Sequence, residues 1–120
     1  MRETKTTNPQ LIELIALLHK QGREQQAPIW LDVADSLAKT RSQRVVVNLS
    51  NINRNTKKAD VVVVPGKILA SGALDHAITI AAFEASDSAK AKLEASKAKY
   101  ITITELVKKN PKGSNVKIIR

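Results

Sequence analysis

The stretch DVVVVPGKILASGAL, residues 60–74, decides the fold of this chain. Its four consecutive valines, Val61–Val64, cannot alternate between core and water, so they predict a strand that is covered on both faces. Pro65 has no N–H for a strand ladder and Gly66 tolerates a positive φ, so the pair predicts a turn that ends this strand. A second short strand, Lys67–Ala70, follows. The stretch therefore predicts a buried hairpin with a lysine at its corner, which is either an anion contact or a plain turn.

Length and composition exclude several classes of protein. With 120 residues and 13.1 kDa, the chain has the size of one domain with a single core. It contains no cysteine, which excludes disulfide frameworks, thiol catalysis and cysteine-ligated zinc and suits a reducing cytoplasm. The longest apolar run near the polar N-terminus, Leu14–Leu18, is too short for a signal peptide or a membrane span. We therefore expect a protein that stays in the cytoplasm.

The charge balance points to a polyanion as partner. There are 20 Lys and Arg against 11 Asp and Glu, and the net charge is +9. A soluble basic protein without an acidic partner is the alternative. The chain has only one each of Phe, Trp and Tyr, so RNA recognition by base stacking on a sheet is unsupported, and phosphates, 2′-hydroxyls and shape are the expected contacts. Trp30 is expected to be a buried core residue with its N–H satisfied, in preference to a stacking platform.

The N-terminal part of the chain predicts a tail and two helices. Residues 1–7 are polar and should form a flexible basic tail, which leaves residues 8–120 as the single folded domain. Asn8-Pro9 predicts a helix start, and Gly22 predicts its end. Pro28 opens a second amphipathic helix. The two helices should form a helical hairpin whose apolar faces need a surface to lie on.

The rest of the chain alternates between strands and helices. Besides the valine-rich stretch, the expected strands are Val45–Leu49, Ile78–Ala82, Tyr100–Ile103 and Val116–Ile119. The expected helices are one capped by Ser86, Asp87 or Ser88 and a short one, Glu105–Lys109, capped by Thr104. This alternation over the last third of the chain favours a parallel sheet with right-handed crossovers.

The strongest local charge signal lies between Asp35 and Asp60. No acidic residue occurs between these two positions, and the segment contains six cations: Lys39, Arg41, Arg44, Arg54, Lys57 and Lys58. Three asparagines lie among them and predict a turn or short helix rich in amides: Asn51, Asn53 and Asn55. Cations with amides suit phosphate and sugar contacts, whereas a solvated basic surface is the structural alternative.

The sequence contains no complete catalytic or nucleotide-binding motif of the kinds considered next. Asp75 and His76 are adjacent, but neither a serine-centred motif nor a second carboxylate accompanies them, so we treat them as turn residues. Gly66-Lys67 lacks the spacing of a P-loop, and there is no GxGxxG. An enzyme is unsupported by these residues.

Several motifs together resemble one known family over nearly the whole chain, from Asn8 to Arg120. The most specific are VPGKILASG, residues 64–72, and the ending NPKGSNVKIIR, residues 110–120. They resemble the archaeal and eukaryotic large-subunit ribosomal protein family numbered eighteen-e, which is related to bacterial large-subunit protein fifteen, and the length is closer to that of archaeal members. The resemblance implies an α/β fold with irregular strand-strand-helix winding, bound to large-subunit ribosomal RNA. Together with the helical hairpin, this predicts hairpin packing on a mixed, partly parallel sheet.

We therefore expect a non-catalytic constituent of the large ribosomal subunit, with ribosomal RNA and neighbouring ribosomal proteins as partners and without a cofactor or a metal. A free regulatory or chromatin-type nucleic-acid binder is the alternative. The residues expected to contact RNA, in order of priority, are Arg41, Arg44, Arg54, Lys57, Lys58 and Lys67, then Lys112, Lys117 and Arg120, then Arg2 and Lys5.

Overall fold

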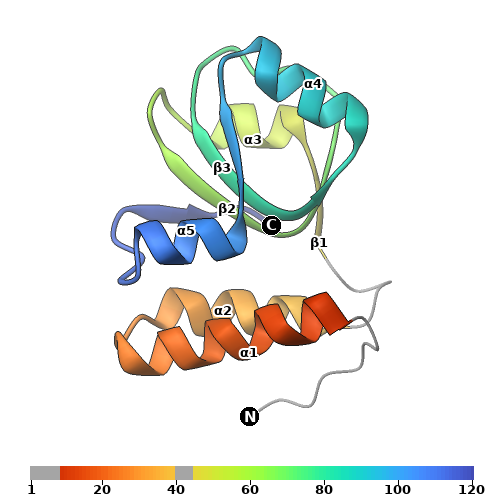
Figure 1. The fold of residues 1–120 in the computed structure, drawn as a ribbon. Helices are drawn as coiled ribbons and strands as arrows, with labels where there is room; N and C mark the ends of the chain where they lie inside the picture. The colour runs from red at the N-terminus through yellow and green to blue at the C-terminus, as the bar shows by residue number, and fades with distance from the viewer. Residues whose placement is uncertain (1–8, 40–44) are drawn as a thin grey trace.

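Strand β2 (Val61–Leu69) is the centre of a five-stranded sheet in this computed structural model, which describes residues 9–39 and 45–120 (Figure 1). The elements before it are α1 (Pro9–Glu24), α2 (Pro28–Leu37), β1 (Val45–Asn48) and α3 (Leu49–Asn55). The elements after it are β3 (Thr79–Ala85), α4 (Asp87–Ala95), β4 (Lys99–Thr102), α5 (Ile103–Lys109) and β5 (Val116–Ile118).

All strand pairings in the described residues are parallel. The sheet runs β1-β2-β3-β4, and β5 also pairs with β2, beside the half of β2 that β1 leaves open. The α/β class is confirmed, but the sheet is parallel and not mixed. The connection from β2 to β3, residues 70–78, crosses back without a helix, and this is the irregular step in the winding.

The predicted hairpin at Pro65-Gly66 is wrong, because β2 runs through both residues as one strand. Its register with β3 shifts there: Val64 pairs with Ala82, and Lys67 pairs with Glu84. Two residues of β2 thus oppose one residue of β3, and this arrangement is a β-bulge. A bulge accommodates Pro65, because proline has no N–H to donate to the neighbouring strand. A Cβ on Gly66 would lie 2.0 Å from the carbonyl oxygen of Val45, so only glycine lets β1 approach. Pro65 and Gly66, which predict a turn, instead form a bulge within a continuous strand.

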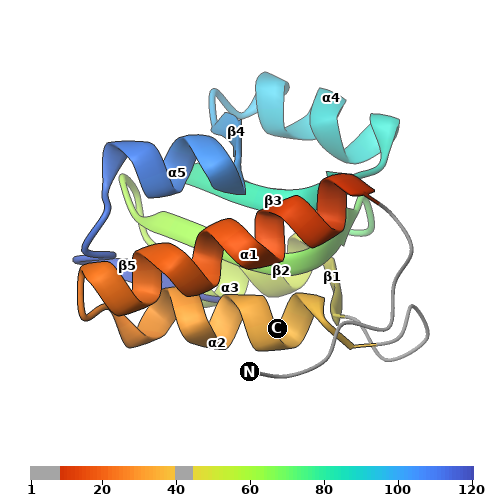
Figure 2. The ribbon, with the colours of Figure 1, turned by 60° about the horizontal axis from the view of Figure 1, so that its bottom comes forward.

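Helices cover both faces of the sheet (Figure 2). Helices α1, α2 and α5 share one buried cluster with Val63 of β2, which confirms that the N-terminal helix pair packs on the sheet. Helices α3 and α4 pack on the opposite face, against a cluster that includes Val62 and Val64. The predicted double coverage of the valine run is therefore confirmed.

Trp30 is a core residue, as predicted. Its side chain is fully buried, and its Nε1–H donates to the carbonyl oxygen of Pro111 over 2.7 Å. This bond joins α2 to the loop that leads into β5.

Two helix boundaries differ from the predicted ones. Helix α1 continues past Gly22 to Glu24, and a Cβ at Gly22 would lie 2.7 Å from the Leu31 side chain, so this glycine serves the packing of α1 on α2 and is not a helix stop. The cap of α5 is Thr102 and not Thr104, since Thr102 forms a reciprocal capping box with Glu105. With Thr102 as the cap, the helix begins at Ile103, whose side chain is buried.

Candidate nucleic-acid interface

Helix α3 and the loop after it carry three exposed cations, Arg54, Lys57 and Lys58, which we call the α3 cluster. The helix is fixed to the sheet by Leu49 and Ile52, both fully buried. Arg54 lies in its last turn, where a cation interacts favourably with the helix dipole. Among the described residues, none of the three side chains forms a salt bridge. The fold thus presents three exposed cations beside a helix that is anchored to the core, with the Asp60 carboxylate near Lys57.

An open groove of about 620 Å³ lies beside the α3 cluster. Its lining comes from α3 and from the end of the chain: Asn51, Asn55, Lys117, Ile118, Ile119 and Arg120. Asn55 Nδ2 donates to the backbone and side-chain oxygens of Asn51, both over 2.7 Å. Amide groups at the edge of such a groove are donors and acceptors suited to phosphate oxygens and ribose hydroxyls.

Lys117 and Arg120 line the groove but are already paired with carboxylates. Lys117 Nζ donates to Asp60 Oδ2 over 2.9 Å, and this bond, with a second from the backbone N–H of Lys57, lowers the pKa of Asp60. The Arg120 guanidinium makes two bonds to Asp32, of 2.8 and 3.0 Å, and these raise the pKa of Arg120. Both cations are about half exposed, so they remain accessible while they tie β5 and the chain end to the fold.

The other predicted RNA contacts do not join the α3 cluster. Lys67 is exposed but lies near the far end of β2 from the α3 loop, next to Val46 and Glu84 on the neighbouring strands. Lys112 is exposed in the loop before β5 and belongs to a segment separate from α3. The remaining four predicted contacts lie outside the described residues: Arg2, Lys5, Arg41 and Arg44.

A chain of contacts links the end of α3 with the loop before β3. His76 Nδ1 lies 2.7 Å from Asp75 Oδ1, and His76 Nε2 lies 2.7 Å from Thr56 Oγ1. The contact with His76 lowers the pKa of Asp75. The order Asp, His, hydroxyl is that of a hydrolase triad, but the Thr56 hydroxyl donates its proton to the Ile52 carbonyl over 2.8 Å. These contacts tie the end of α3 to the loop before β3.

Sequence reasoning missed three exposed lysines that come together around α5: Lys99, Lys108 and Lys109, which we call the α5 cluster. The Lys99 side chain reaches that of Lys109 and lowers the pKa of Lys109. The nearby Glu105 carboxylate is used by the capping box. A signal was present, since residues 106–120 contain five cations and no acidic residue.

Two further features bear on function. In residues 9–39 and 45–120, no group of three or more His, Asp or Glu side chains could hold a metal ion. Within the same ranges, no helix is both long and apolar enough to cross a membrane.

Comparison with known proteins gives one consistent match. Residues 1–120 match the family described as "Ribosomal protein 60S L18 and 50S L18e". The relatives include the large ribosomal subunit proteins eL18 of the archaea Methanoregula boonei and Methanococcus maripaludis, each 44% identical over 119 residues, which cover 99% of this chain and 98% and 99% of the relative. That of Halobacterium salinarum is 43% identical over 114 residues, which cover 95% of this chain and 97% of the relative.

Proposed function

The chain belongs to the family of ribosomal proteins 60S L18 and 50S L18e, and from this premise we propose how it serves the large ribosomal subunit. It is a structural constituent of that subunit, acts in translation and is not an enzyme. Its partners are ribosomal RNA and other ribosomal proteins, and its place in the cell is the ribosome, in the cytoplasm.

We propose that the α3 cluster is the first contact with ribosomal RNA. Arg54, Lys57 and Lys58 are exposed and their side chains form no salt bridge among the described residues, so no such pair has to break when phosphates approach. That single observation carries the assignment. Sugar and phosphate groups beside these cations would meet the amides of Asn51 and Asn55 in the groove.

Lys117 and Arg120 belong to the same interface in a second role. Their ion pairs with Asp60 and Asp32 hold one side of the groove, and their exposed halves add positive potential to it. The predictions for Lys67 and Lys112, and for the four residues outside the described ranges, remain predictions of separate contacts.

Association with the large subunit tests the proposal. The tagged protein is expressed in cells. Large subunits are then isolated by sedimentation and washed with moderate salt. We expect the protein to stay bound through the wash, and the variant with Arg54, Lys57 and Lys58 all changed to Gln to be lost at lower salt, because fewer counterions are released on binding.

The alternative, a free regulatory nucleic-acid binder, gives a different pattern. Such a protein would sediment with other nucleic acids and leave the large subunits in the first wash. That result would contradict the proposal, whereas retention of both the protein and the triple variant would contradict only the role given to the α3 cluster.

A further inference from the structure

Four strands of the sheet begin at the same level. The register aligns Val116 of β5 with Val61 of β2, Val61 with Thr79 of β3, and Thr79 with Lys99 of β4. Because all pairings are parallel, the loops that enter these strands meet at one end of the sheet, which we call the entry end. Neighbouring strands are ~4.8 Å apart, so these loops span roughly 14 Å from β5 to β4.

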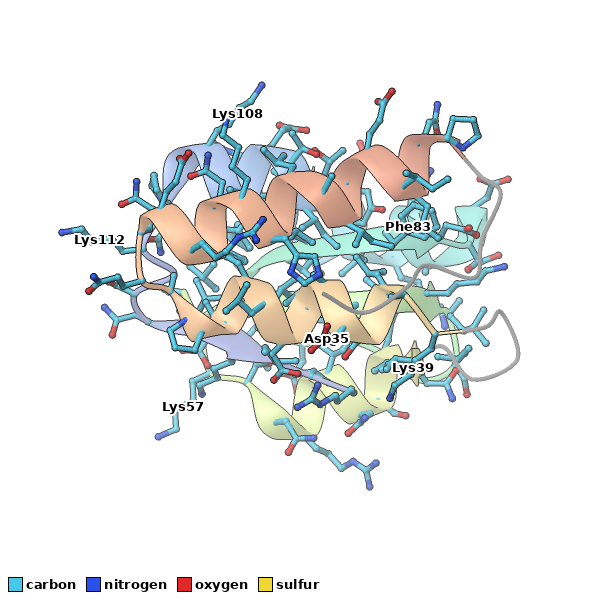
Figure 3. The ribbon with its side chains drawn as sticks, turned by 90° about the horizontal axis from the view of Figure 1, so that it is seen from below. Asp35, Lys39, Lys57, Phe83, Lys108 and Lys112 are labelled. Carbon is cyan, nitrogen blue, oxygen red and sulfur yellow. The ribbon has the colours of Figure 1, made fainter. Side chains whose placement is uncertain are left out.

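The entry end collects cations from segments that are far apart in sequence. The loop before β2 brings Lys57 and Lys58, and the loop before β5 brings Lys112. The α5 cluster, Lys99, Lys108 and Lys109, lies on the same side. Figure 3 shows Lys57, Lys108 and Lys112 on one side of the molecule and Lys39 and Phe83 toward the other.

Three carboxylates of the described residues lie at or near this end: Asp60, Asp75 and Glu105, the last of which also acts on Lys109. Asp60 is the one carboxylate in the loops before β2, β4 and β5, and Lys117 pairs with it. In the loop before β3, Asp75 lies against His76. Lys99 and Lys109 instead lie against each other, and this like-charge contact lowers the pKa of Lys109. An anion placed between two such ammonium groups relieves their repulsion.

We propose that the entry end is one continuous surface for the backbone of double-helical RNA, with the loop before β2 and the α5 cluster on different rows of phosphates. This inference rests on the proposed function, since it names the form of RNA, adds Lys99, Lys108 and Lys109 to the contacts and places Lys112 on the same surface. These cations lie in the loops that enter β2 and β5, at the start of β4 and at the end of α5, and the strand register fixes the spacing of the three strands. Cations at fixed spacing match the regular phosphate array of a duplex better than a flexible single strand.

The aromatic residues exclude the usual way of holding single-stranded RNA, which is to stack unpaired bases. Trp30 is fully buried, and Phe83 lies toward the other end of the molecule. Tyr100 is partly buried against the core, with the Lys90 ammonium 6.0 Å from the centre of its ring. With no free aromatic surface at the entry end, the phosphates and 2′-hydroxyls of a duplex are the groups it can read.

The test compares two probes with the same number of phosphates, a blunt RNA duplex and an unstructured oligouridine, by fluorescence anisotropy over a salt series. Wild-type protein should bind the duplex more tightly. The variant Lys108→Gln/Lys109→Gln should lose affinity for it, and its salt slope should become shallower by roughly two, one for each phosphate contact removed. The variant Lys108→Arg/Lys109→Arg should restore binding, which excludes a folding defect.

The control is Lys20→Gln, which removes one exposed charge from α1. Equal affinity for the two probes, or an equal loss per charge removed in the two Gln variants, would overturn the inference. Deproteinised large-subunit ribosomal RNA is the third probe. If wild-type protein fails to bind that RNA, the proposed function falls; if it binds that RNA without preferring the duplex, only the inference falls.

Discussion

Replacing Trp30 tests how strongly one residue joins the helix pair to the rest of the fold. Its side chain is fully buried among residues of α1, α2 and α5, and Nε1–H bonds the Pro111 carbonyl over 2.7 Å. Trp30→Ala removes the packing and the bond together, so we expect it to lower the free energy of unfolding by about 3 to 5 kcal/mol. A small domain has about 5 to 15 kcal/mol in total, so much of the protein would be close to unfolding.

Trp30→Phe separates the two contributions. The phenyl ring keeps most of the packing but leaves the Pro111 oxygen without its donor, which costs about 1 to 3 kcal/mol. Urea unfolding followed by circular dichroism measures both variants, with Phe83→Ala, a partly buried aromatic, as the control with a smaller effect. If Trp30→Ala leaves stability unchanged and weakens RNA binding, Trp30 is a contact residue and the reasoning from burial is refuted.

Two other changes probe the sheet and its edge. Gly66→Ala should destabilise the protein by about 1 to 3 kcal/mol in thermal unfolding, because its Cβ would lie 2.0 Å from a carbonyl oxygen of β1; wild-type stability would show that the strands can separate without cost. Asp60 has a lowered pKa in the fold, so its contribution to stability is present above its unfolded pKa and is lost as pH falls through the folded value. Asp60→Asn should therefore make the unfolding midpoint less dependent on pH below about pH 4, and an unchanged acid profile would remove the role given to its bond with Lys117.

The sequence was sufficient for the class of fold because its periodic patterns are local. The valine run predicted a doubly covered strand, and Asn8-Pro9 and Pro28 predicted the two helices. Pro65-Gly66 was misassigned because a turn and a bulge favour the same residue types. Both can use a residue that lacks an N–H, such as proline, and one that lacks a Cβ, such as glycine. Only the pairing with β1 and β3 decides between them, and that pairing is a property of the whole sheet.

In the candidate site too, local features were predicted from the sequence and long-range pairings were not. Exposure of Arg54, Lys57 and Lys58 follows from a charge run without acidic residues, and the sequence predicted it. The pairing of Lys117 and Arg120 did not follow, because their partners lie 57 and 88 residues away. The α5 cluster was missed for a related reason, since strand register alone brings Lys99 to the same end as the lysines of α5.

The most direct test of the central claim measures binding to deproteinised large-subunit ribosomal RNA over a salt series. The variant Arg54→Gln/Lys57→Gln/Lys58→Gln leaves the buried side of α3 intact, so its unfolding should change little. Its salt slope should be shallower than that of wild type by roughly three.

The control for this measurement is again Lys20→Gln. Lys90 and Lys92 are unsuitable, because the Lys90 ammonium lies 6.0 Å from the centre of the Tyr100 ring and the Lys92 ammonium donates to the carbonyl oxygens of Ala70 and Gly72. The account predicts a larger loss of affinity for each charge removed from the α3 cluster than from the control position. Equal loss per charge would show that net charge, and not the α3 cluster, determines binding to ribosomal RNA.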